Sequence, residues 1–156
     1  MNDFKQVNPI IQIDVRGLCV LPYEGHPKGC SNFNKRSNCP PIIPTFSKVV
    51  DISKPIYVIW NVFDFGSHIQ KMKDKHPKWS QRQLECCLYW QGSARKKLKE
   101  KIEEFKKIYP DYQISICPEG MGINITETMK QLGVELEWPP KNKTYQVALA
   151  YILKKE

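Results

Sequence analysis

Four of the six cysteines in this sequence have the residue type and the surroundings of metal ligands: Cys19, Cys30, Cys39 and Cys117. Ten and eight residues separate the first three, and proline follows both Cys39 and Cys117. All four lie in expected loops or strand ends, whereas buried structural cysteines usually lie on a periodic apolar face. Thiolates bind zinc and iron–sulfur clusters, and a Cys-Pro step recurs in iron–sulfur ligation. We therefore expect one metal centre on these residues, with a [4Fe–4S] cluster as the first choice and a zinc ion as the alternative. If no metal binds, the four cysteines are unligated thiols in loops.

Two further cysteines and one histidine are candidate substitutes for a ligand. Cys87 falls on the apolar stripe of an expected helix, so packing alone explains it. Cys86 lies off that stripe near Arg82, where cations would make its thiol more reactive, although chance placement is the simpler interpretation. Either thiol replaces Cys19 as a ligand if the N-terminal cysteine is too distant. His26 has a side chain that suits zinc and some iron sites.

Length and composition favour one domain over residues 1–156 that stays outside the membrane. No apolar run approaches the roughly 20 residues that span a bilayer, and the first residues lack the basic start and apolar stretch of a signal peptide. A cytoplasmic location follows as the expectation. Disulfides are rare in that reducing compartment, and spaced cysteines there more often bind metal.

The segment of residues 17–44 is expected to be an irregular cysteine loop, since it holds three Cys, three Gly and five Pro. A loop of this length needs something that organises it, and a metal would do so. Regular elements are expected outside it, with capping boxes at Ser67 and Ser80. The expected strands are residues 10–15, 56–63, 112–116, 134–138 and 145–153, and the expected helices are a short one ending near Pro77, one over 80–108, and one from Asn124 to Gly133. This order predicts an α+β fold, a mostly antiparallel sheet with helices packed on one face and a long cysteine-bearing metal loop.

The net charge of +8 is concentrated in one part of the chain. Residues 71–107 hold twelve Lys and Arg against five Asp and Glu. Such a basic stretch attracts nucleic acid or another polyanion, whereas a solvated lysine-rich helix is the simpler reading. If nucleic acid binds, Tyr89 and Trp90 would stack bases beside Arg82 and residues 95–97.

Several motifs together resemble a microbial family known only as predicted metal-binding proteins with a Cys-Pro-Pro signature. The resemblance rests on Gly17-Leu-Cys19, Pro22-Tyr23, Gly29-Cys30, Ser37-Asn-Cys39-Pro-Pro41 and Cys117-Pro-Glu-Gly-Met-Gly-Ile-Asn124, about a quarter of the chain. It implies Cys19, Cys30, Cys39 and Cys117 as ligands and supplies no reaction. Proteins of that family often carry more cysteines in the second region, whereas this sequence has only Cys117 there. A second cluster is therefore not expected here.

Three functions are compatible with such a site. A cluster would serve redox or sulfur-handling chemistry on an anionic substrate, which Lys28, Lys35 and Arg36 would attract. A structural zinc ion would instead support a protein that binds nucleic acid through the basic helix. The third reading is an adaptor that meets a protein partner through outward aromatics such as Trp60, Trp79 and Trp90. Phosphate-binding loops, nucleophile elbows and His-Glu-x-x-His motifs are absent from the sequence, which argues against a hydrolase of the usual types.

Overall fold

The computed structural model describes residues 4–21, 29–30, 34–37 and 39–155, and the backbone alone at Cys19 and Val20. In chain order, the elements are β1 (Phe4–Gln6), η1 (Ile13–Val20), α1 (Phe46–Val49), β2 (Tyr57–Phe63), α2 (Phe65–Lys75), α3 (Gln81–Leu84), η2 (Cys87–Tyr89), α4 (Gln91–Ile108), β3 (Gln113–Ser115), η3 (Pro118–Met121), α5 (Ile125–Lys130) and β4 (Thr144–Tyr151), where η marks a 3₁₀ helix. The expected α+β character and antiparallel sheet are confirmed.

The sheet has the strand order β1-β2-β4-β3, and every pairing is antiparallel. The central pair, β2 and β4, is made of β-branched, aromatic and small apolar residues, which suit a pleated surface buried on both sides. Val58 lies opposite Leu149 and Ile59 opposite Ala148. Because neighbouring side chains in a strand point to opposite faces, this register supplies apolar residues to both faces of the sheet.

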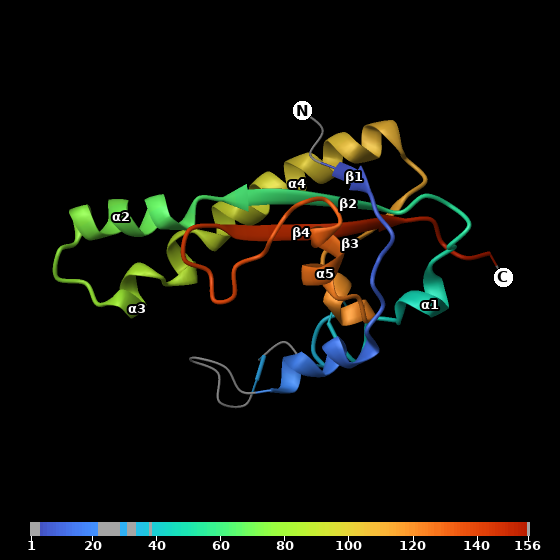
Figure 1. Cartoon of the computed structure of the whole chain (residues 1–156), viewed down its shortest axis with the longest axis horizontal. Coiled ribbons are helices and arrows are strands. Elements are labelled where there is room, and N and C mark those ends of the chain that lie inside the picture. The colour runs from blue at the N-terminus through green and yellow to red at the C-terminus, as the bar shows by residue number, and fades with distance from the viewer. Residues whose placement is uncertain (1–3, 22–28, 31–33, 38, 156) are drawn as a thin grey trace.

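Helices cover both faces of this sheet, so the expectation of helices on one face is wrong (Figure 1). On one face, Leu98 and Phe105 of α4 pack with Ile59 and the alanines of β4. On the other, residues of α1, η3 and α5 form a second cluster around Val58 and Leu149. The sequence predicted α5 but not that it covers this second face, and α1 and η3 are too short to show an apolar period.

Residues 80–108 form three elements instead of the single expected helix. The capping box at Ser80 is present and begins α3. The chain then turns at Glu85, whose carbonyl accepts a hydrogen bond from Trp90 Nε1 at 3.3 Å. Trp90 stacks on Phe63 with ring centroids 5.1 Å apart, and α4 starts directly after it. Leu88, next to Cys87 in η2, is consequently 86% exposed.

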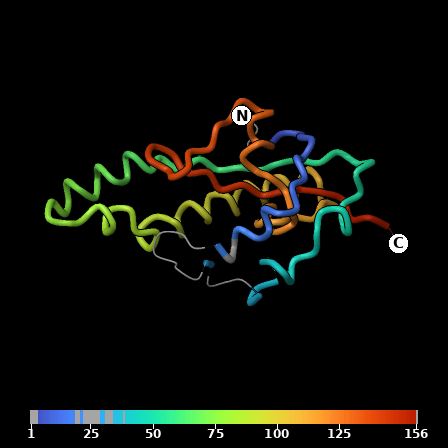
Figure 2. The backbone as a smooth tube through the Cα atoms, turned by 60° about the horizontal axis from the view of Figure 1, so that its bottom comes forward, coloured from blue at the N-terminus to red at the C-terminus, as the bar shows by residue number. Residues whose placement is uncertain are grey.

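The helices α2 and α3 project together from one end of the sheet, as both backbone views show (Figures 1 and 2). The expected short helix before Pro77 is α2, but its N-cap is Asp64, whose side chain accepts from the Ser67 backbone N–H. Among the described residues, no helix combines the length and the apolar character needed to cross a membrane.

Two expected strands do not form. Residues 10–15 make one isolated bridge, Ile11 to Ile123, before the chain enters η1. Residues 134–138 have no strand structure, although Val134 and Leu136 pack against the core cluster that contains Val58. The apolar alternation at residues 134–138 thus reported partial burial correctly, whereas Ile11 and Ile13 are more than half exposed.

Candidate functional site

One arginine joins three of the segments that carry the expected cysteine ligands. Arg16, in η1, donates from Nε to the Gly120 carbonyl at 2.7 Å and from Nη2 to the Ile43 carbonyl at 2.8 Å. A longer contact of 3.4 Å joins Nη2 to the Pro41 carbonyl. The planar guanidinium presents its donors in a fixed fork, which suits it to hold several carbonyls at once. The segments bearing Cys19, Cys39 and Cys117 are therefore adjacent in the fold.

Cys39 and Cys117 themselves line the same cavity. A Cβ added at Gly120 would lie 3.1 Å from Cys117 Sγ and 3.2 Å from Pro40 Cδ, so the two Cys-Pro segments pass each other at this glycine. Hydrogen bonds fix both backbones: Cys39 N–H donates to the Arg36 carbonyl at 3.0 Å, and Cys117 N–H donates to Ser115 Oγ at 3.3 Å. The structure thus brings together two of the four expected ligands, which are separated by 78 positions in the sequence.

The two other expected ligands are less well placed by the structure. Cys30 is a half-buried free thiol. Cys19 lies in η1, three residues after Arg16, but its side chain is outside the described part of the chain, as is all of His26. Among the side chains that are described, no three His, Cys, Asp or Glu residues gather closely enough to hold a metal ion. Two soft thiol donors on one cavity wall match half of a Cys₄ centre, and they suit iron–sulfur or zinc better than a hard cation.

Glu119 is a site residue that the sequence analysis did not single out. It follows the Cys117-Pro118 step in η3 and lines two cavities, of 690 and 980 Å³. Its side chain still contacts solvent, yet protein surrounds it so closely that desolvation raises the pKa of its carboxyl above the usual value. The sequence signal that could have identified Glu119 is its position between the candidate ligand Cys117 and the glycines Gly120 and Gly122.

A groove of 980 Å³ extends from Cys39 and Cys117 along the edge of the sheet. Its lining includes one face of α4 and residues of the segment 136–147. Five cations line it: Arg36, Arg95, Lys99, Lys106 and Lys143. The acids in its lining are Glu119 and Glu137. This size is at the upper end of the range for ligand pockets, and the charge favours an anion.

Glu137 organises one wall of the groove. Its Oε1 accepts backbone N–H groups from Lys141, Asn142 and Lys143 at 3.1, 2.7 and 2.9 Å. These three hydrogen bonds stabilise the charged form and lower the pKa of the Glu137 carboxyl to about 2. Because its charge is satisfied by the loop that follows, Glu137 is a structural residue of the groove.

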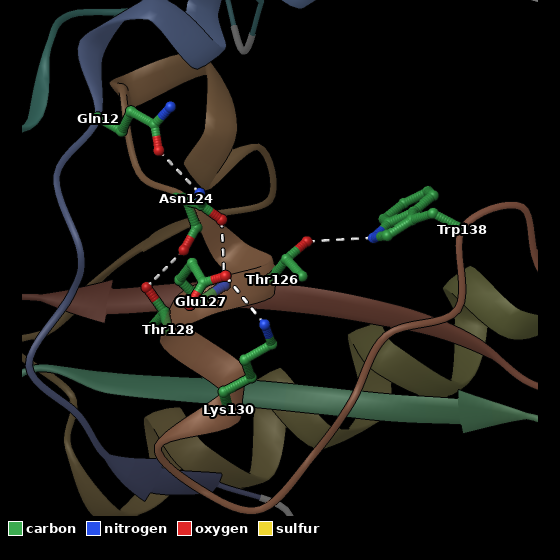
Figure 3. Close-up of polar contacts among 7 residues, drawn as sticks. All are labelled: Gln12, Asn124, Thr126, Glu127, Thr128, Lys130 and Trp138. Atoms are coloured by element: carbon green, nitrogen blue, oxygen red, sulfur yellow. Dashed lines mark hydrogen bonds and ion pairs between the residues drawn. The ribbon is translucent and has the colours of Figure 1, made fainter.

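Trp138 is held in place while its ring remains largely uncovered. Its Nε1 donates to Thr126 Oγ1 at 3.1 Å, next to the N-cap of α5 (Figure 3). In the same region Asn124 donates to Gln12 at 2.9 Å and so ties α5 to the segment before η1. The Trp138 side chain is nevertheless 71% exposed. Trp138 thus combines a fixed orientation with an exposed ring, and the sequence analysis did not single it out.

The remaining candidates differ from their expected roles. Cys87 is exposed rather than packed on an apolar face, and Cys86 is half-buried at the start of η2. Tyr89 is tilted against Trp79, with ring centroids 5.2 Å apart, and therefore does not stand beside Trp90 as a second stacking residue. Trp60 packs against the core.

Comparisons with known proteins add no assignment to this geometry: no family model, no curated protein and no solved structure matches the chain.

Proposed function

We propose that this protein binds a metal centre through Cys39 and Cys117, with Cys30 and Cys19 as the further ligands. The observation that supports it is the Arg16 fork, which joins the segments of Cys19, Cys39 and Cys117 through the carbonyls of Gly120 and Ile43. A charged group that binds three irregular segments in this way is expected where their relative position matters for function.

A [4Fe–4S] cluster is the proposed form of the centre, with one zinc ion as the alternative. Both ligating steps on the groove wall are Cys-Pro, and this step recurs in iron–sulfur ligation. Thiolates hold either metal, so the choice between them is made by the test below. When bound, a cluster would supply electron transfer or an open iron for an anionic substrate.

The test is the metal content of protein purified without oxygen. A brown protein with about four irons and four acid-labile sulfides per chain is the expected result. Serine substitution of Cys39 or Cys117 should lower the metal content to less than about half, since removing one thiolate weakens the whole site. Cys87→Ser is the matched control, because Cys87 is exposed on η2 and lies outside the groove.

Each alternative result has a defined meaning. A colourless protein with about one zinc per chain, lost in the Cys39 and Cys117 variants alone, selects the zinc alternative. Purified protein without stoichiometric metal, or equal metal loss in the Cys87 control, contradicts the proposed site.

A further inference from the structure

The groove beside the cysteines follows an open edge of the sheet. Within the described chain, β3 pairs only with residues 149–151 of β4, so residues 144–148 have no strand partner on that side. Four of these five residues line the groove: Thr144, Tyr145, Gln146 and Val147. The open edge of β4 is therefore part of the groove, and α4 packs beside this strand.

The cations of the groove form a row along α4. Arg95, Lys99 and Lys106 all line the groove and are exposed. Steps of four and seven residues keep them on one helix face, and a rise of 1.5 Å per residue spreads them over about 16 Å. A compact anion such as a mononucleotide is best bound by cations that converge on one point. A row of cations instead matches a linear polyanion with a charge at each repeat.

Aromatic side chains from outside α4 also line the groove. Trp138 presents a ring that is 71% exposed and oriented by its hydrogen bond to Thr126. Tyr145, on the open strand edge, also lines the groove and is half-buried. Bases stack on such rings without regard to sequence, provided that they are not already stacked in a duplex.

The acids of the groove leave this charge pattern largely intact. Glu137 is committed to three backbone N–H groups of its own loop. Even with Glu119 and Glu137 both charged, the two acids are outnumbered by the five cations of the groove lining. The groove lining is therefore net cationic, with a row of cations on α4 and exposed aromatic surface outside that helix.

We propose that this groove binds single-stranded nucleic acid, with Arg95, Lys99 and Lys106 along its phosphates and Trp138 stacked on a base. This function goes beyond the metal centre and does not depend on it, because none of these four residues belongs to a cysteine segment. The groove's contact with Cys39 and Cys117 places the strand next to the metal site.

The test is fluorescence anisotropy with a labelled single strand of roughly 12 thymidine nucleotides at about 50 mM salt. The groove variant is Arg95→Glu with Lys99→Glu. The matched control, Lys97→Glu with Lys107→Glu, makes the same change of charge on residues of α4 that do not line the groove. The groove variant should weaken binding by about tenfold or more and the control by less than about threefold. Trp138→Ala should weaken binding by about fivefold or more.

The wild-type protein supplies an independent readout. Three phosphate contacts on a single strand predict a slope of about −2 in log K against log salt. Equal losses in the groove variant and its control would overturn the proposal. So would equally tight binding of a duplex, or displacement of the strand by adenosine monophosphate at equal phosphate concentration, which would assign the groove to a small anion.

Discussion

Replacing Arg16 with methionine tests the architecture of the candidate site most directly. The change keeps an apolar stem of similar length and removes the fork that reaches the Gly120 and Ile43 carbonyls at 2.7 and 2.8 Å. Hydrogen bonds to a charged group contribute about 1.5–3 kcal/mol each, which gives a range of about 3–6 kcal/mol for the two. Arg16 is half-buried, so water replaces part of the lost bonding. We expect the free energy of unfolding to fall by about 3 kcal/mol, near the lower end of that range.

The assay is equilibrium unfolding in urea, followed by circular dichroism, with the midpoint and the slope fitted separately. Arg16→Lys should lose about half as much, because one ammonium group cannot reproduce the fork. Arg36→Met is the control, since Arg36 is exposed in the neighbouring cysteine segment and should change stability by less than about 0.5 kcal/mol. A loss below about 1 kcal/mol for Arg16→Met, or a loss equal to that of the control, would refute the role given to this residue.

Two further predictions concern the backbone around the site. Gly122→Ala should cost about 1–3 kcal/mol in the same urea assay, because Gly122 has a φ of +91° and an added Cβ would lie 2.8 Å from Ile13 Cδ1. Gly17→Ala, where no atom lies within 4 Å of the added Cβ, should be near neutral, and equal losses at the two glycines would contradict this reasoning. Glu137→Gln should lower the melting temperature at pH 7, since the carboxylate accepts three backbone N–H groups. The pKa of Glu137 is depressed from 4.5 to about 2. The difference in melting temperature from wild type should therefore be full above about pH 4.5, shrink as the pH falls toward 2, and vanish only below about pH 2. A difference that stays constant with pH would contradict this reasoning.

Local signals in the sequence predicted several elements well. The β-branched and aromatic run at residues 56–63 is β2, and the run from Tyr145 is most of β4. The capping box at Ser80 and the Asn124 N-cap of α5 are both present. Each of these signals is contained within a few consecutive residues, so no distant partner is needed to interpret it.

Elements that depend on distant partners were predicted less well. Val134 and Leu136 alternate like a strand, but Glu137 turns the chain back on its own loop and the ladder does not form. The expected helix over residues 80–108 is interrupted where Trp90 stacks on Phe63, a contact between segments far apart in the sequence. Periodicity reports which side chains prefer to be buried, whereas the partner that buries them belongs to the tertiary fold.

The sequence alone determined the donor chemistry of this protein: soft thiols in irregular Cys-Pro segments and an excess of positive charge over residues 71–107. Only the tertiary structure decided which of these groups meet. The Arg16 contact with Gly120 spans 104 positions, and the groove combines α4, the open edge of β4 and the Trp138 wall. Hydrogen bonds and cavities of this kind arise between segments that become neighbours only when both faces of the sheet are covered, so no local pattern encodes them.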